Sequence, residues 1–463
     1  MGAVAAVDLG ATSGRVMLGY VGHNELSVRP VARFPNGPGT RPDGLHWDID
    51  TLREHVLDGL AATIREDSAV ASIGVDSWAV DYALMNGGRM LAPPFHYRDE
   101  RNLPAVEQVH ALVSPAELYA ANGLQFLPFN TLYQLVAEQR LAEAERFLLI
   151  PDLFGFWLTG RAVAERTNAS TTGLLGVSTG EWDDAVITRL GLPRHPFPAL
   201  VDPGTALGTV LPEIAARIGG SPVVTAVGSH DTASAVVAVP ATGDDFAYIS
   251  CGTWGLVGVE LEAPILTEES RVANFTNEGG VDGRVRFLHN VMGLWLLTES
   301  IREWENVSLP QLLDAASALA TDVAVFDVDD PRFLAPGDMP GRIAEWCRER
   351  GQPVPGSPVE FVRSIVESLA VAFANAVRTA SELSGKPVSV IHIVGGGSQN
   401  ELLCQLTADR SGMPVLAGPV EATAIGNVLV QARAQGFSTG SLEALRSLVA
   451  RAFSPVRYSP RPA

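Results

Sequence analysis

The stretch Ala5–Gly19, AAVDLGATSGRVMLG, decides the fold assignment. Small apolar residues lead into Asp8, a turn rich in Gly, Ser and Thr follows, and apolar residues then resume. This order predicts a strand, a turn and a second strand. The segment Phe246–Glu260 repeats the plan about 240 residues later, with Gly252–Gly255 as its turn. The repeat indicates an internal duplication, with a domain boundary near Pro240–Asp245, where Pro, Gly and Asp cluster.

Periodicity outward from these hairpins predicts an α/β fold. Apolar residues at helical spacing predict helices over Thr51–Arg65, Pro104–Leu112, Thr131–Ala144, Asp152–Leu158, Val359–Leu383, Gln399–Arg410 and Glu421–Gln435. Short apolar runs predict strands over Ser72–Val75, Val80–Met85, Val223–Val227, Val388–Val394 and Pro414–Leu416. Strands that alternate with helices favour parallel pairing, and the hairpins add antiparallel strands, so each sheet is expected to be mixed. The segment Pro193–Pro222, rich in Pro and Gly, is expected to loop over the surface.

Composition excludes several classes of protein. The chain has 463 residues, a length that favours two or three domains, and its net charge of −19 would repel nucleic acid and anionic membranes. Its three cysteines, Cys251, Cys347 and Cys404, form no C-x-x-C pair, which argues against a disulfide framework or a Cys-rich zinc site. No apolar run approaches about 18 residues, so no membrane span is expected. The sequence therefore predicts a cytoplasmic protein.

Three glycine-rich turns each follow an apolar strand: Gly10–Gly14, Gly252–Gly255 and Gly395–Gly397. None matches a P-loop or a dinucleotide fingerprint. Each turn taken alone fits an ordinary structural connection better than a phosphate site, because connections between strands and helices often need glycine. Glycine lets backbone N–H groups approach phosphate oxygens closely, so the three turns together with the repeated hairpin favour a bound nucleotide.

Two aspartates stand where a carboxylate can assist phosphoryl transfer. Asp8 ends the first strand and either binds Mg²⁺, directly or through water, or bonds to its own turn. Asp231 follows a strand and precedes the small-residue run Ala233–Ala238. It either accepts a hydroxyl proton or caps a helix. His230 beside it either donates to a sugar hydroxyl or has a structural role.

Polar and aromatic residues alternate in three segments, Asp76–Asp81, Phe95–Asp99 and Gly123–Asn130. Carboxylates mixed with aromatic rings are typical of sugar sites, although aromatic residues also build cores. An apolar wall for a methyl group could be built by one or more of four residues of the third segment: Leu124, Phe126, Leu127 or Phe129.

The motifs of the chain occur in a specific order. They read AAVDLGATSGRVMLG, GVDSWAVDYAL, NGLQFLPFNTLYQL, GSHDTASAV, YISCGTWGLVG, NEGG, NVMGLWLL, HIVGGGSQN and GPVEATAIGN, and they cover Ala5 to Asn427. In this order the chain resembles the carbohydrate kinases of the glycerol kinase–xylulokinase–rhamnulokinase family, within the actin-like ATPase superfold. The segments FLPFNTLYQL and SHDTASAV are similar to the rhamnulokinase branch.

The resemblance implies an architecture and a reaction. The expected fold is two actin-like, ribonuclease H-like α/β domains with mixed sheets flanked by helices and a cleft between them. Residues 1–240 would bind sugar and residues 241–463 nucleotide. The implied reaction is ATP- and Mg²⁺-dependent phosphorylation of L-rhamnulose at the C1 hydroxyl, by a monomer or a homodimer. Alternatives are a kinase for L-fuculose or L-xylulose, and a non-catalytic actin-like protein that binds sugar or nucleotide.

The resemblance also implies residue roles. Asp231 would accept the proton, and Asp8 would lie near Mg²⁺. The implied ketose contacts are Ala79, His230, Asp231, Thr232 and Asn290. The implied nucleotide contacts are Ala11, Thr12, Ser13, Gly14, Arg15, Thr253, Thr298 and Gly396. Two positions depart from the family pattern, since Ala79 stands where glycine is common and Thr298 where relatives have glutamine.

Overall fold

The first hairpin forms where the sequence predicts it. In the computed structural model, which describes residues 1–305, 307–319 and 323–462, β1 (Gly2–Leu9) pairs antiparallel with β2 (Ser13–Val21). Every residue of β1 is buried, as expected of a strand covered on both faces. The second predicted hairpin is confirmed as β14 (Phe246–Cys251) and β15 (Trp254–Leu261), which also pair antiparallel.

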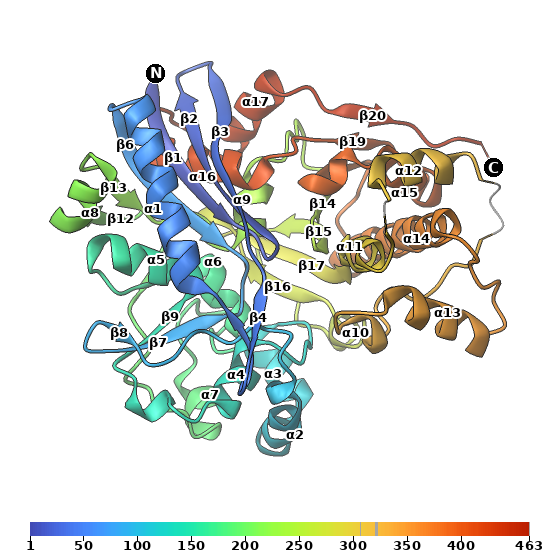
Figure 1. Cartoon of the computed structure of the whole chain (residues 1–463), viewed down its shortest axis with the longest axis horizontal. Helices are drawn as coiled ribbons and strands as arrows, with labels where there is room; N and C mark the ends of the chain where they lie inside the picture. Colours follow the sequence, from blue (N-terminus) through green and yellow to red (C-terminus); the bar gives the residue numbers. More distant parts are fainter. Residues whose placement is uncertain (306, 320–322, 463) are drawn as a thin grey trace. The chain divides into compact units, whose positions relative to one another are not determined.

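The chain divides into two units, each assembled from separated segments (Figure 1). Unit 1 comprises Met1–Ala238, Glu260–Phe287 and Ala422–Ala452. Unit 2 comprises Val239–Val259, Leu288–Glu421 and Phe453–Ala463.

The main sheet of unit 1 has the strand order β12-β13-β6-β1-β2-β3. β6 runs parallel to β1 and β13 parallel to β6, while β2, β3 and β12 add antiparallel pairs, so the sheet is mixed as predicted. The strands of this unit are β1, β2, β3 (Leu26–Pro35), β4 (Pro38–Arg41), β5 (Gly44–Trp47), β6 (Val70–Ser77), β7 (Tyr82–Asn86), β8 (Arg89–Met90), β9 (Arg146–Leu149), β10 (Ala164–Glu165), β11 (Leu200–Val201), β12 (Ala206–Thr209), β13 (Val223–Thr225) and β16 (Thr276–Gly279).

Helices pack on this sheet through their apolar stripes. The α-helices of unit 1 are α1 (Ile49–Glu66), α2 (Leu103–Leu112), α3 (Pro115–Asn122), α4 (Thr131–Ala137), α5 (Ile150–Thr159), α6 (Arg166–Ala169), α7 (Asp184–Arg189), α8 (Pro212–Ile218), α9 (Asp231–Val237), α10 (Glu268–Val272), α16 (Ala422–Ala434) and α17 (Leu442–Ala452), and its short 3₁₀ turns are η1 (Glu100–Asn102), η2 (Leu141–Glu143), η3 (Ser170–Thr172) and η4 (Val281–Gly283). α1 buries Leu52, Val56 and Leu60 toward β2 and β3. α16 packs on β1, β2 and β6 although it comes from the last part of the chain (Figure 1).

The second mixed sheet has the order β16-β17-β15-β14-β18-β19-β20, and its strands β14, β18, β19 and β20 belong wholly to unit 2. The further strands of this sheet include β17 (Val285–Met292), whose residues Val285–Phe287 belong to unit 1, together with β18 (Val390–Val394), β19 (Val415–Ala417) and β20 (Val456–Tyr458). The helices of unit 2 are α11 (Trp295–Arg302), α12 (Leu309–Ser317), α13 (Met339–Glu349), α14 (Pro358–Ser384) and α15 (Glu401–Ser411), with η5 (Pro331–Phe333) and η6 (Gly396–Gln399). β18 runs parallel to β14 and to β19. The long amphipathic helix expected over Val359–Leu383 is confirmed as α14.

Two expectations are wrong in detail. The helix expected over Thr131–Ala144 ends at Ala137, because Glu138 is extended and its carboxylate accepts from the Arg140 N–H and the Tyr82 hydroxyl instead. The segment Pro193–Pro222 is not all loop, since it contains β11, β12 and α8. There Pro212 begins α8 and Gly219 ends it in the left-handed conformation (φ 85°), so the two residues mark helix ends.

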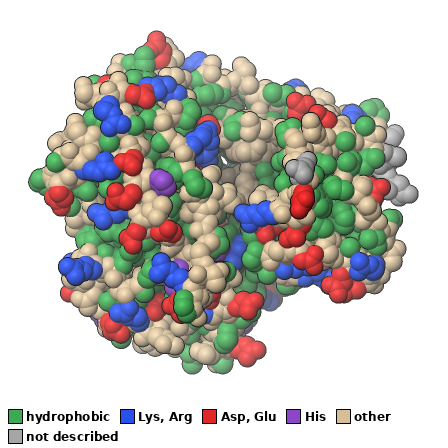
Figure 2. Space-filling view, in the orientation of Figure 1, with side chains coloured by type: hydrophobic (Ala, Val, Ile, Leu, Met, Phe, Trp, Pro, Cys, Tyr) green, Lys and Arg blue, Asp and Glu red, His purple; other side chains and the backbone are tan. Residues whose placement is uncertain are grey.

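The surface carries acidic and basic side chains interspersed on the face that Figure 2 shows. None of the helices in the described ranges combines the length and the apolar character that a bilayer crossing requires.

Candidate active site

The first predicted phosphate turn is the exposed tip of the β1–β2 hairpin. Asp8 and Arg15 pair across the hairpin, with Arg15 Nε 3.0 Å from Asp8 Oδ2. The Gly10 N–H donates to Ser13 O over 2.9 Å, which closes the turn. Thr12 and Ser13 are exposed, as a turn that receives an anion requires.

Asp76 places a second carboxyl group beside Asp8. It lies opposite Asp8 in the parallel β1–β6 pair, and both side chains are buried. Asn427 Nδ2, from α16, donates to Asp76 Oδ2 over 2.5 Å. Burial raises the pKa of Asp76 well above its usual value and the charge of Asp8 raises it further, while the bond from Asn427 opposes the rise. Asp76 therefore takes a proton more readily than an ordinary aspartate does.

This carboxyl pair is the candidate magnesium ligand of unit 1. Within the described part of the chain, no three His, Cys, Asp or Glu side chains are grouped to hold a metal ion. Mg²⁺ keeps several waters and is usually bound by one or two carboxylates together with substrate phosphates. Asp8, with Asp76 next to it, fits that requirement.

Ala79 lies in a tight turn directly after β6. The Trp78 N–H donates to Leu9 O over 3.1 Å, so this turn lies beside the end of β1. Val80 has a left-handed backbone conformation (φ 69°). This conformation is unusual for a β-branched residue. Thr131 Oγ1 donates to Val80 O over 2.7 Å and holds this conformation. Backbone strain of this kind is common at functional sites, and the strained residue, Val80, directly follows Ala79.

The buried carboxylate of Asp81 accepts hydrogen bonds that stabilise the same turn. Its Oδ2 accepts from Trp47 Nε1 at 2.6 Å, from Trp78 Nε1 at 3.1 Å and from the Tyr97 N–H at 3.2 Å. Its Oδ1 accepts from Gln134 Nε2 at 3.0 Å. Burial raises the pKa of Asp81 to about 7, although these hydrogen bonds oppose the rise.

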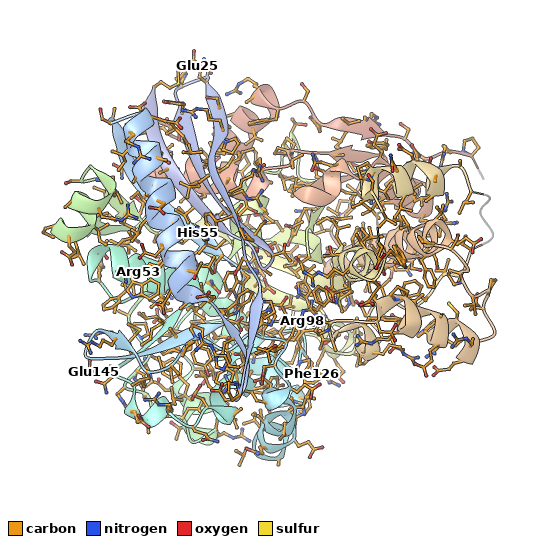
Figure 3. The ribbon with its side chains drawn as sticks, in the orientation of Figure 1. Glu25, Arg53, His55, Arg98, Phe126 and Glu145 are labelled. Carbon is orange, nitrogen blue, oxygen red and sulfur yellow. The ribbon has the colours of Figure 1, made fainter. Side chains whose placement is uncertain are left out.

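Phe129, Phe126 and Leu124, which the sequence offers as candidates for an apolar wall, lie on different surfaces. Phe129 is buried and its ring lies 5.2 Å from that of Tyr97, in the cluster around Asp81. Phe126, labelled in Figure 3, is exposed instead and lies 5.8 Å from the ring of Tyr133. Phe126 and Leu124 line a separate pocket of about 430 Å³ between α2, α3, α4 and α10.

Asp231 is the first residue of α9, and its carboxyl group is 30% exposed. The interpretation of Asp231 as a helix cap is wrong, because His230 is the N-cap residue. Thr232 Oγ1 lies 3.2 Å and His230 Nε2 3.4 Å from Asp231 Oδ1. The structure thus brings together three of the predicted sugar contacts, and it leaves the Asp231 carboxyl group partly open to solvent.

Glu165 anchors the loop that carries Asp231. Its Oε2 accepts from the Ser229 N–H at 2.9 Å and from Ser229 Oγ at 2.8 Å. The Ser77 N–H donates to Ser229 O over 2.9 Å, so the loop also runs along the end of β6. Burial raises the pKa of Glu165, and the bonds from Thr167 and Ser229 oppose the rise. These contacts fix the backbone immediately before His230.

His230 contacts two buried charged residues on its other side. Arg286 Nη2 lies 3.0 Å from His230 Nδ1, and Glu278 Oε2 lies 3.3 Å from the same nitrogen. Arg286 Nη1 is 3.2 Å from Glu278 Oε2, and Arg286 Nε donates to Gly279 O over 2.9 Å. The Arg286 side chain is completely buried.

The other two glycine-rich turns lie close together in unit 2. Thr253 lies in the turn between β14 and β15, and the N–H of Trp295, where α11 begins, donates to Thr253 O over 3.2 Å. Gly396 follows β18, which pairs with β14. A Cβ at Gly397 would lie 2.2 Å from Cys251 Sγ, so the two turns approach as closely as glycine allows. Gly396 has open space where a side chain would be.

The remaining predicted contacts also lie in unit 2. Thr298 is half-buried in the first turns of α11, and Asn290 is half-buried near the end of β17. The predicted site residues are therefore divided. Unit 1 holds Asp8, Ala11, Thr12, Ser13, Gly14, Arg15, Ala79, His230, Asp231 and Thr232, and unit 2 holds Thr253, Asn290, Thr298 and Gly396.

Sequence reasoning assigned no role to Glu165, Arg286, Glu278 or Asn427. Glu278 and Asn427 fall in the quoted motifs NEGG and GPVEATAIGN, so the motif order did signal them. Glu165 and Arg286 stand in no such motif. Their roles become visible only through contacts between residues at least 56 positions apart.

Comparison with known proteins assigns the family. Residues 3–238 match the N-terminal domain and residues 247–435 the C-terminal domain of the FGGY family of carbohydrate kinases. The chain is 41% identical to a rhamnulokinase of Bacteroides thetaiotaomicron, over 98% of this chain and 95% of that protein. It is 43% identical to a rhamnulokinase of Pectobacterium atrosepticum, over 99% and 93%.

Solved structures confirm the predicted fold. A xylulose kinase from Lactobacillus acidophilus matches with a TM-score of 0.79 at 17% identity, over 100% of this chain and 94% of that one. A glycerol kinase from Plasmodium falciparum matches with a TM-score of 0.78 at 15% identity, over the same shares. The fold is therefore the actin-like α/β fold of these kinases. The chain belongs to the FGGY family of carbohydrate kinases: it is a sugar kinase, and the family implies ATP as its phosphoryl donor.

Proposed function

We propose that this enzyme transfers the γ-phosphoryl group of ATP to the C1 hydroxyl of L-rhamnulose, giving L-rhamnulose 1-phosphate and ADP in L-rhamnose catabolism. Identities of 41–43% to proteins named rhamnulokinase, over nearly the whole chain, support the choice of sugar. The observation that carries the mechanism is the partly exposed carboxylate of Asp231, with Thr232 and His230 near one of its oxygens.

In this proposal Asp231 is the general base. It accepts the C1 hydroxyl proton while that oxygen attacks the γ-phosphorus, and the bond from the γ-phosphorus to the ADP oxygen breaks. Phosphoryl transfer needs little covalent help beyond positioning, charge neutralisation and such a proton acceptor. Thr232 and His230 hold the carboxylate and contact the ketose, together with the backbone of Ala79 and with Asn290.

The nucleotide contacts are proposed on the glycine-rich turns. Backbone N–H groups and hydroxyls of Ala11–Arg15 would receive phosphate oxygens, with Thr253, Thr298 and Gly396 contributing from unit 2. The side chain of Thr298 is shorter than the glutamine that relatives have at this position, so it would reach less far toward the nucleotide. Bound Mg²⁺ would neutralise phosphate charge, and Asp8 with Asp76 beside it is the proposed protein ligand.

Discrimination at C6 is proposed to come from the cluster near Ala79. L-Rhamnulose carries a methyl group at C6, and the buried ring of Phe129 offers an apolar contact for it. A hydroxyl placed against this ring without a partner would cost about 1–3 kcal/mol. That cost corresponds to roughly 10–100-fold in kcat/KM.

A coupled assay of ADP release over a ketose panel tests the proposal. The panel contains L-rhamnulose, L-fuculose, L-xylulose and L-fructose, which has a hydroxyl at C6. The expected result is the highest kcat/KM for L-rhamnulose, roughly 10–100-fold above L-fructose. Equal values for these two ketoses would contradict the apolar contact, and a higher value for L-fuculose or L-xylulose would change the substrate. No sugar-stimulated release with any ketose would point to a non-catalytic binding protein.

A further inference from the structure

We infer that Arg286 fixes His230 as the tautomer with its proton on Nε2, so that the single N–H of this ring faces the Asp231 carboxylate. Arg286 is thereby a positioning residue of the reaction. The inference rests on the proposed roles of His230 and Asp231, which it deepens, and it concerns residues of unit 1 alone.

The geometry around Arg286 leaves its guanidinium little freedom. The group is completely buried and is directed to three partners by three different nitrogens. Nη2 lies 3.0 Å from His230 Nδ1, Nη1 lies 3.2 Å from Glu278 Oε2, and Nε donates to Gly279 O over 2.9 Å. A planar guanidinium held at three points cannot turn away from the imidazole ring without breaking a buried contact.

The chemistry of the two groups then decides the proton position. Arginine has five N–H donors, no acceptor, and stays protonated in proteins. The Nδ1 atom that meets Nη2 must therefore offer its lone pair. A neutral imidazole has one donor and one acceptor nitrogen, so the proton of His230 is on Nε2.

Glu278 is the group that favours the other tautomer. Its Oε2 lies 3.3 Å from His230 Nδ1 and would accept a proton carried there. The guanidinium is nearer to Nδ1, at 3.0 Å, and the same carboxylate is already paired with Arg286. A proton on Nδ1 would also face an arginine N–H, which places two donors against each other. The effect of Arg286 on the proton position of His230 is therefore larger than the effect of Glu278.

The tautomer of His230 determines how this ring contacts the carboxylate of Asp231. His230 Nε2 lies 3.4 Å from Asp231 Oδ1, and Thr232 Oγ1 lies 3.2 Å from the same oxygen. His230 Nε2 and Thr232 Oγ1 then both present an N–H or O–H group to Asp231 Oδ1, and they fix this oxygen in place. The other oxygen, Oδ2, is left to accept the proton of the C1 hydroxyl. The other tautomer would turn a lone pair toward the carboxylate and repel it.

The tautomer is measured directly by long-range ¹H–¹⁵N correlation on the full chain labelled with ¹⁵N-histidine. His230 is assigned by its absence from the spectrum of His230→Gln. At about pH 8, the expected pattern is a pyridine-type shift for Nδ1 and a pyrrole-type shift for Nε2. The reverse pattern in the unaltered protein would overturn the inference, whatever the variants do.

Variants separate this role from a structural one. Arg286→Met removes the donor and leaves Glu278, so the proton of His230 is expected to move to Nδ1 and kcat to fall at least about tenfold. Glu278→Gln leaves the Arg286 donor in place and should keep the proton on Nε2. The matched control is Arg446→Met, which breaks another buried pair of unit 1, with Glu260 at 2.8 and 2.9 Å. It should lower stability without changing the His230 tautomer.

An unchanged Nε2–H tautomer in Arg286→Met would overturn the role of Arg286. The tautomer is recorded without substrate, so it is independent of turnover. If Asp231→Asn kept full activity while the predicted tautomer was observed, the proposed base would fail and the assignment of the proton would stand.

Discussion

At the scale of single residues, the candidate site is built from carboxyl groups whose surroundings set their charge. Asp8 is paired with Arg15, Asp76 beside it takes a proton more readily, and Asp231 is partly exposed at the start of a helix. The three aspartates therefore differ in burial and in the charges near them, and a strongly perturbed carboxyl group such as that of Asp76 is typical of an active site.

Asp81 gives a prediction about pH. Its pKa is raised to about 7 by burial, against 3.8 for an ordinary aspartate, so the folded protein binds this proton more tightly than the unfolded chain. The stabilising contribution is complete below about pH 4 and is lost as pH rises through about 7. Relative to Asp81→Asn, which does not titrate, the free energy of unfolding should fall by roughly 2–4 kcal/mol over that range.

Urea unfolding of the unaltered protein and of Asp81→Asn at several pH values between 5 and 8 checks this prediction. The expected observation is a difference between the two proteins that changes as pH rises from 5 to about 7 and levels off above that. Two curves that stay parallel over the range would show that Asp81 does not titrate there.

At the scale of elements, the close contact of α9 with α16 positions the start of α9. A Cβ at Gly426 would lie 1.8 Å from the backbone oxygen of Ser234, which no side-chain movement relieves. Asp231 is the first residue of the same short helix. Any shift of α9 away from α16 therefore moves the proposed base.

Gly426→Ala is accordingly expected to lower the free energy of unfolding by about 2 kcal/mol or more and to reduce kcat in the protein that remains folded. Gly37→Ala is the control, because nothing lies within 4 Å of the added methyl group. Thermal unfolding and steady-state kinetics of both variants give the comparison. Equal stability of the two variants would contradict the rigid helix contact.

The glycine turn after β18 provides a second pair of variants. Gly395 has φ 83° and a Cβ there would lie 3.0 Å from Cys251 O, whereas Gly396 has open space. Gly395→Ala is expected to destabilise the fold by about 1–3 kcal/mol. Gly396→Ala should keep the unfolding free energy within about 0.5 kcal/mol of the original and raise KM for ATP several-fold. An unchanged KM in Gly396→Ala would remove this turn from the nucleotide site.

At the scale of the whole molecule, the sequence predicts local features well and long-range assembly poorly. Both hairpins and α14 follow from local periodicity, and the order of motifs assigns the family. By contrast, α16 and α17 join unit 1 from the last part of the chain, and no local pattern indicates which sheet a helix covers.

The same difference between local and long-range features explains which residues of the candidate site the sequence predicts. Asp8 and Asp231 are visible in the sequence because each lies where a predicted strand gives way to a turn rich in small residues. Arg286 lies 56 positions from His230, and Glu165 lies 64 positions from Ser229. A charged residue inside a strand or at a strand end has no local signature of the partner it will meet. Such partners require the folded chain.

In the proposed mechanism the carboxylate of Asp231 accepts the sugar proton. The most direct test of this role is sugar-stimulated ADP release by Asp231→Asn with saturating ATP and L-rhamnulose, together with the Kd for ATP by calorimetry. The control is Asp314→Asn, which alters an exposed carboxylate on α12 and should behave as the unaltered enzyme. We predict that Asp231→Asn lowers kcat by about 10²–10⁴-fold and leaves the Kd for ATP within about twofold. Turnover close to that of the unaltered enzyme would contradict this role.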